Sequence, residues 1–92
     1  MNPVQKYFVE FIGTALLVFV VLKTGNYLAI GAALAIAVFV GGSISGGAFN
    51  PAVAIAMMAS GKISALEIVP YIVAQVAGGL FAYELVKRSG GD

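Results

Sequence analysis

The 92 residues hold few side chains that could carry out covalent or metal chemistry. The absence of cysteine and histidine excludes disulfides, thiolate chemistry and the usual zinc sites. The remaining residues do not form a nucleophile with an adjacent base, so we expect neither an enzyme nor a bound metal or cofactor. The polar chemistry that remains belongs to amide, hydroxyl and backbone groups.

Residues 46–60 are the segment that most strongly indicates a function, because the backbone there cannot continue as a regular helix. Gly46 and Gly47 loosen a helix and Pro51 removes a hydrogen-bond donor, so a helix breaks there. The apolar run after Pro51 ends at Ala59, which at about 1.5 Å per residue covers roughly half of a bilayer. Irregular backbone at that depth is tolerated only where protein buries it or where it lines a water-filled cavity. The segment therefore predicts a re-entrant loop and half-helix beside a pore.

The composition indicates that lipid is the solvent. Hydrophobic residues make up 61% of the chain and charged residues 10%, whereas a soluble domain carries about 45–50% and about 25%. A soluble chain of this length could not cover its core with so little polar surface. The net charge of +1 offers no electrostatic argument for nucleic acid as a partner.

Three further segments are apolar over roughly 20 residues, the length that crosses a bilayer as a helix. They run over about 4–22, 27–45 and 66–86. We therefore expect an all-α membrane protein in one domain over 1–92, with three transmembrane helices plus the re-entrant half-helix. Such a chain is an integral, multi-pass membrane protein, and the sequence does not indicate which membrane holds it. Tyr7, Tyr27 and Tyr71 lie near the expected membrane surfaces, where aromatic residues gather.

Three motifs resemble the aquaporin (major intrinsic protein) family. Residues 10–14 match its Glu-x-x-Gly-Thr signature in the first helix, residues 45–53 look like its first Asn-Pro-Ala loop, and residues 71–79 resemble its third helix. The likeness covers nearly the whole chain in the family's order and spacing. It implies the N-terminal half of the fold only, because family members carry two such halves that are inverted in the membrane.

The resemblance also implies pore and selectivity residues. Asn50 would offer its amide to a single file of solute, Pro51 would start the half-helix, and Ala52 would pack against a partner half-helix. Four loop residues would present backbone carbonyls to the solute: Gly46, Gly47, Ala48 and Phe49. Two positions depart from the family pattern. Val53 follows the Asn-Pro-Ala where the family's second half has arginine, and Ile30 stands where a pore-facing aromatic is usual.

Polar side chains inside the expected spans have a functional interpretation by default. For Glu10 and Gln75, the resemblance suggests hydrogen bonds that brace the loop. Two other interpretations of Glu10 stay open, a position near the lipid headgroups and a role in proton coupling. Three glycines are expected to let helices pack closely: Gly13, Gly78 and Gly79.

The distribution of cations bears on how half a pore could work. With the family's topology, Lys6 and Lys62 lie on the cytoplasmic side and Lys23, Lys87 and Arg88 on the other. The cytoplasmic excess that normally sets orientation is absent. A chain without that bias could insert both ways and form antiparallel pairs, which have the inverted symmetry of membrane repeats. We therefore expect a dual-topology homodimer that completes one pore, and as a further step an octamer of four pores.

The expected activity is a passive channel for water, with glycerol or other small neutral solutes as further candidates. Three alternatives stay open. The chain could be a half-channel fragment that needs a separate partner half, a non-conducting accessory subunit, or a proton-coupled exporter.

Overall fold

The computed structural model describes residues 2–90, and these form helices and connecting turns without a strand. The helices are α1 (Pro3–Thr24), α2 (Tyr27–Ser45), α3 (Pro51–Ala59) and α4 (Ile68–Arg88), and a 3₁₀ turn, η1 (Ala65–Glu67), leads into α4. Three helical stretches are long and apolar enough to cross a membrane: Pro3–Thr24, Tyr27–Ser45 and Ala65–Arg88. The expected class, an all-α membrane protein with three long helices and one short helix, is confirmed.

Local sequence signals place the boundary between the first two helices. Gly25 ends α1 in the left-handed conformation at φ 55°, which glycine adopts without steric penalty. Asn26 then begins α2, because its side-chain oxygen accepts from the backbone N–H groups of Leu28 and Ala29, at 2.9 Å each. The chain therefore reverses within two residues, and α2 lies antiparallel to α1.

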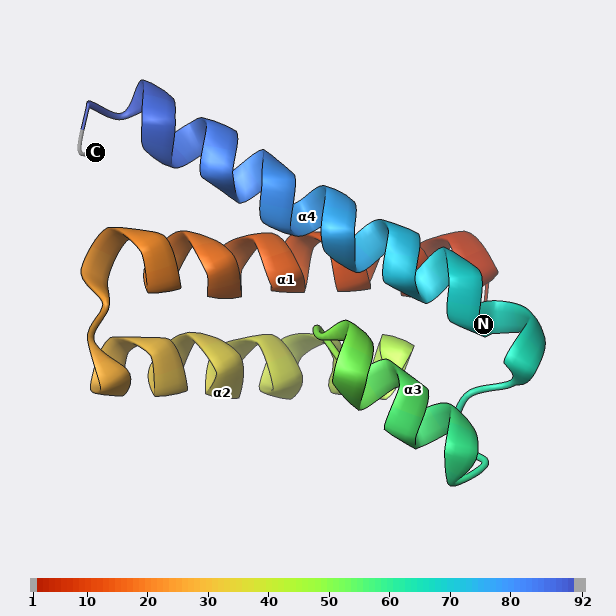
Figure 1. Cartoon of the computed structure of the whole chain (residues 1–92). Helices are drawn as coiled ribbons and strands as arrows, with labels where there is room; N and C mark the ends of the chain where they lie inside the picture. Colours follow the sequence, from red (N-terminus) through yellow and green to blue (C-terminus); the bar gives the residue numbers. More distant parts are fainter. Residues whose placement is uncertain (1, 91–92) are drawn as a thin grey trace.

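Helix α1 is the central element and packs against both α2 and α4 (Figure 1). The buried residues of α2 recur every four positions and so form one face: Ala33, Ala37, Gly41 and Ser45. Those of α4 also share a face: Tyr71, Gln75, Gly78, Ala82 and Val86. All members of the α2 set are small, as are Gly78 and Ala82 of the α4 set. Small residues let helices approach closely in lipid. The outer faces carry exposed apolar side chains, among them Phe39 on α2 (89% exposed) and Leu80 on α4 (61%).

Helix α3 is re-entrant. After α2 ends, the chain doubles back, so that α3 starts alongside the middle of the bundle and runs outward to the end where α1 and α4 begin (Figure 1). It packs on α4. A small apolar core of Ala48, Ala54, Ile63 and Tyr71 holds it there. The first residues of α3 thus lie at mid-depth of the long helices.

Candidate functional site

The loop between α2 and α3 has an unusual backbone. Gly46 and Gly47 have φ values of 89° and 71°, and Phe49 has φ 53°. A left-handed conformation is unfavourable for a residue with a Cβ, by roughly 1–2 kcal/mol. It persists only where the surroundings hold it. Phe49 is held firmly, since only 1% of it is exposed.

The carboxylate of Glu10 is the main support of this loop. Its Oε2 accepts from Ser45 Oγ at 2.6 Å and from the backbone N of Ala48 at 3.2 Å. Its Oε1 accepts from the backbone N of Phe49 at 2.7 Å and from Gln75 Nε2 at 2.8 Å. Glu10 is fully buried, and no cation pairs with it among the described residues. Four hydrogen-bond donors from three parts of the chain therefore compensate for burying this carboxylate without a cation.

The side chain of Phe49 fixes the loop from its other side. A Cβ at Gly13 would overlap the Phe49 ring, and one at Gly41 would lie 3.4 Å from its Cζ. The space beside Gly13, a residue expected to serve helix packing, is thus filled by this ring. The side chain of Phe49 points into the protein between α1 and α2.

Asn50 caps the half-helix. Its Oδ1 accepts from the backbone N of Ala52 at 2.7 Å and of Val53 at 3.3 Å. Pro51 occupies the first helical position, where its missing N–H is no loss. Asn50, Ala52 and Val53 are exposed. The N-terminal end of α3, where a helix carries partial positive charge, therefore stands open with the Asn50 amide Nδ2 beside it.

The remaining predicted residues lie apart from this end. Ile30 is half-buried and lies in the first turn of α2, whereas the loop to α3 follows the last residue of that helix. A Cβ at Gly78 would overlap the backbone carbonyl oxygen of Phe11, so this glycine permits the contact between α1 and α4. A Cβ at Gly79 would meet only Val18 Cγ2, at 3.7 Å.

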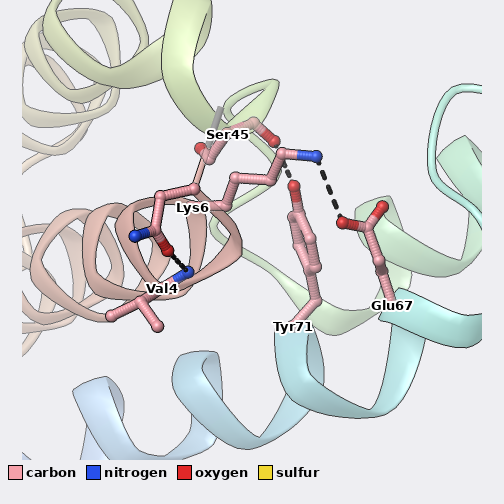
Figure 2. A network of polar contacts seen from close by, with 6 residues as sticks. Val4, Lys6, Ser45, Glu67 and Tyr71 are labelled. Atoms are coloured by element: carbon pink, nitrogen blue, oxygen red, sulfur yellow. Dashed lines mark hydrogen bonds and ion pairs between the residues drawn. The ribbon is translucent and has the colours of Figure 1, made fainter.

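Sequence reasoning missed Tyr71, which it placed at a membrane surface. Tyr71 is buried, and its hydroxyl donates to the backbone oxygen of Ser45 at 2.6 Å (Figure 2). Beside it, Lys6 Nζ pairs with Glu67 Oε2 at 3.1 Å and ties α1 to η1 (Figure 2). Tyr71 lies four residues before Gln75 and hence on the same face of α4. That spacing is the signal that could have assigned it to the loop.

Changing Tyr71 to Phe is expected to lower the free energy of unfolding by about 1 kcal/mol, since the Ser45 carbonyl loses its donor. Tyr83→Phe is the matched control, because Tyr83 is 49% exposed and should tolerate the change. Thermal unfolding in detergent measures both variants. Equal melting temperatures for the two would show that the Tyr71 hydroxyl adds nothing to the support of the loop.

Three apolar spans and a half-helix that enters the bundle define an integral, multi-pass membrane protein with a re-entrant loop. The family model described as major intrinsic protein matches residues 1–90. The chain belongs to the major intrinsic protein family, to whose N-terminal half it corresponds, as the motifs predict.

Individual relatives agree with this assignment. Glycerol uptake facilitator protein-like 6 of Lactiplantibacillus plantarum is 45% identical, over 90% of this chain and 43% of the relative. Aquaporin Z of Photorhabdus laumondii is 47% identical over 63% of this chain and 25% of its own length. Aquaporin-8 of Mus musculus is 37% identical over 91% and 36%. The chain thus spans less than half the length of these relatives. No solved structure matches.

Proposed function

We propose that this chain is a subunit of a passive channel for water and for other small neutral solutes such as glycerol. The observation that carries the proposal is the open N-terminal end of α3, where Asn50 is exposed and its Oδ1 is engaged by the cap. Only the donor Nδ2 of Asn50 is left to face a solute. The names of the relatives, aquaporins and a glycerol uptake facilitator, support the same class of solute.

In this mechanism Asn50 and the end of α3 orient the solute. A water oxygen that accepts from Nδ2 turns its hydrogens away from α3, which interrupts proton transfer along a file of water. The partial positive charge of the helix end also repels cations. The loop of residues 46–49 supplies backbone carbonyls as acceptors, with Gly46 and Gly47 the accessible pair because Ala48 and Phe49 are buried. The Glu10 and Gln75 side chains keep that loop in place. Because Ile30 and Val53 are apolar, the solute path carries no fixed charge at those two positions.

One chain supplies one such helix end, so the pore needs a second half. We propose an inverted second copy in a dual-topology homodimer. Two contacts indicate which cations share an end of the helix bundle. Lys6 pairs with Glu67 near the start of α4, and Lys23 Nζ donates to Ser89 Oγ at 3.0 Å beside the end of α4. Lys6 and Lys62 therefore lie at one end, while Lys23, Lys87 and Arg88 lie at the other. This near balance supports insertion in both orientations.

Asn50→Asp tests the channel. An aspartate still caps α3, so the fold is kept while the amide donor is replaced by a negative charge. We expect the water permeability of liposomes to fall about tenfold. A tenfold change corresponds to about 1.4 kcal/mol, which is close to the contribution of one hydrogen bond. Asn26→Asp is the matched control, because Asn26 caps α2 in the same way at the exposed turn. Wild-type liposomes no more permeable to water and glycerol than empty ones would reject the channel.

Orientation mapping tests the homodimer. The chain has no cysteine, so single cysteines at the exposed residues Thr24 and Ser60 report the two ends without a competing thiol. We expect an impermeant thiol reagent to label each end in about half of the molecules. A single orientation would favour a separate partner half, and transport that requires a pH gradient would favour an exporter. Impermeable liposomes that nevertheless hold a folded chain would favour an accessory subunit.

A further inference from the structure

Two apolar grooves flank the outer face of α1. One, of about 240 Å³, lies between α1 and α2, with Gly13, Gly41 and the Phe49 ring in its lining. The other, of about 320 Å³, lies between α1 and α4 and reaches Phe19 and Leu85. Ile12 and Leu16 border both grooves, so these two side chains form a ridge with a groove on either side. An apolar cavity of about 150 Å³ already holds benzene, so each groove can take an apolar chain.

The two grooves lie around the middle of α1. The groove beside α2 extends along α1 from Phe8 to Leu16, and the groove beside α4 extends from Ile12 to Phe19. From Lys23 to Ile12 the helix rises by about 16 Å, and half of the hydrocarbon core is about 15 Å, so an acyl chain that starts at Lys23 reaches the part of each groove beside Ile12 and Leu16. Both grooves are lined by apolar side chains and glycine alone. Two hydrocarbon chains on either side of the Ile12–Leu16 ridge would match this shape.

The end of the molecule beyond Phe19, where α1 and α4 both terminate, is basic. Lys23 follows Phe19 by about one turn, and its Nζ lies 3.0 Å from Oγ of Ser89, which follows Leu85 by one turn. Lys87 and Arg88 share the single carboxylate of Glu84, at 3.4 and 3.6 Å. Among the described residues of this end, three cations thus face one anion, which leaves charge to bind a phosphate.

We propose that this face of α1 binds an anionic phospholipid. The phosphate contacts Lys23 and Arg88, and the two acyl chains lie in the grooves beside Ile12 and Leu16. The complementary charge favours an anionic over a zwitterionic headgroup, because an added ammonium would oppose the lysines. One chain would touch the ring of Phe49 and so support the loop that Glu10 holds. The proposal does not rest on channel activity, and it is tested by binding alone.

Native mass spectrometry of the purified chain in detergent tests the headgroup. We expect phosphatidylglycerol to bind more tightly than phosphatidylcholine of the same chains. The double variant Lys23→Gln/Arg88→Gln should weaken phosphatidylglycerol by roughly 5-fold for each cation removed. Lys62→Gln, at the other end, is the control and should leave the affinity unchanged. Inorganic phosphate should not displace the lipid. Equal binding of both lipids, or an unchanged double variant, would overturn the proposal.

Leu16→Trp tests the grooves, because its larger side chain intrudes on both. We expect it to lower binding of both lipids while the melting temperature is kept. Leu80→Trp is the control, since Leu80 is 61% exposed on α4 and borders neither groove. A Leu16→Trp variant that loses self-association but keeps lipid binding would assign the grooves to a second copy and reject the lipid. If this variant does not fold, the charge variants decide alone, because their side chains lie at the exposed end.

Discussion

Replacing Glu10 by alanine is expected to lower the free energy of unfolding by about 4 kcal/mol or more. The change removes the acceptor of four hydrogen bonds, at 2.6 to 3.2 Å, in a fully buried position. Two of the donors are the backbone N–H groups of Ala48 and Phe49, which the loop cannot redirect while Phe49 stays in its left-handed conformation. Each buried donor left without a partner costs about 1–3 kcal/mol. Thermal unfolding in detergent, followed by circular dichroism, measures the loss.

Two further variants separate this effect from the loss of a charge. Glu84→Ala removes an exposed carboxylate with two surface ion pairs, and we expect less than about 1 kcal/mol. Glu10→Gln keeps the shape but turns an amide N–H₂ toward groups that are themselves donors, so its stability should lie between those of wild type and Glu10→Ala. An alanine variant at position 10 that melts with the wild type would show that the loop does not depend on this carboxylate.

Gly78→Val is expected to disrupt the packing of α1 on α4. A Cβ at this position would overlap the carbonyl oxygen of Phe11 and come within 3.2 Å of the backbone N of Ala15. Both atoms belong to the backbone of α1, so no rotamer change relieves the overlap and the helices must separate. Overpacking of this kind costs about 1–3 kcal/mol or more. Separation would also pull Gln75 away from Glu10 and would lower the proposed channel activity together with stability.

Gly79→Val is the matched control, since it places the same side chain on the next residue of the same helix. A Cβ there would make ordinary contact with Val18 Cγ2 at 3.7 Å. We expect its melting temperature to stay within a few degrees of the wild type, with that of Gly78→Val well below. Similar melting temperatures for the two variants would contradict the close approach of α1 and α4.

The long helices and the half-helix could be predicted because their signals are local. Gly25-Asn26 supplies a left-handed residue followed by a cap, and Asn50-Pro51 supplies a cap followed by a residue suited to the first helical position. The lengths of the apolar runs then separate full spans from a half-span. The family motifs added Glu10 and Gln75 as residues near the loop.

What surrounds Glu10 could not be derived from such signals. The roles of Phe49 and Tyr71 depend on how near α1 lies to its two neighbours and on the φ of one residue. An apolar ring before Asn50 is equally consistent with lipid contact, and a tyrosine near the end of a span equally suits a membrane surface. Only the packed bundle shows that both side chains turn inward.

By itself, the sequence determined that this is a membrane chain of three spans and one half-span, because hydropathy, breakers and caps act over short stretches of chain. The tertiary structure decided how the half-helix is held. The ring beside Gly13, the hydroxyl on Ser45 and the four donors on one carboxylate join residues from distant parts of the chain. Their contacts exist only once the helices have packed at close range.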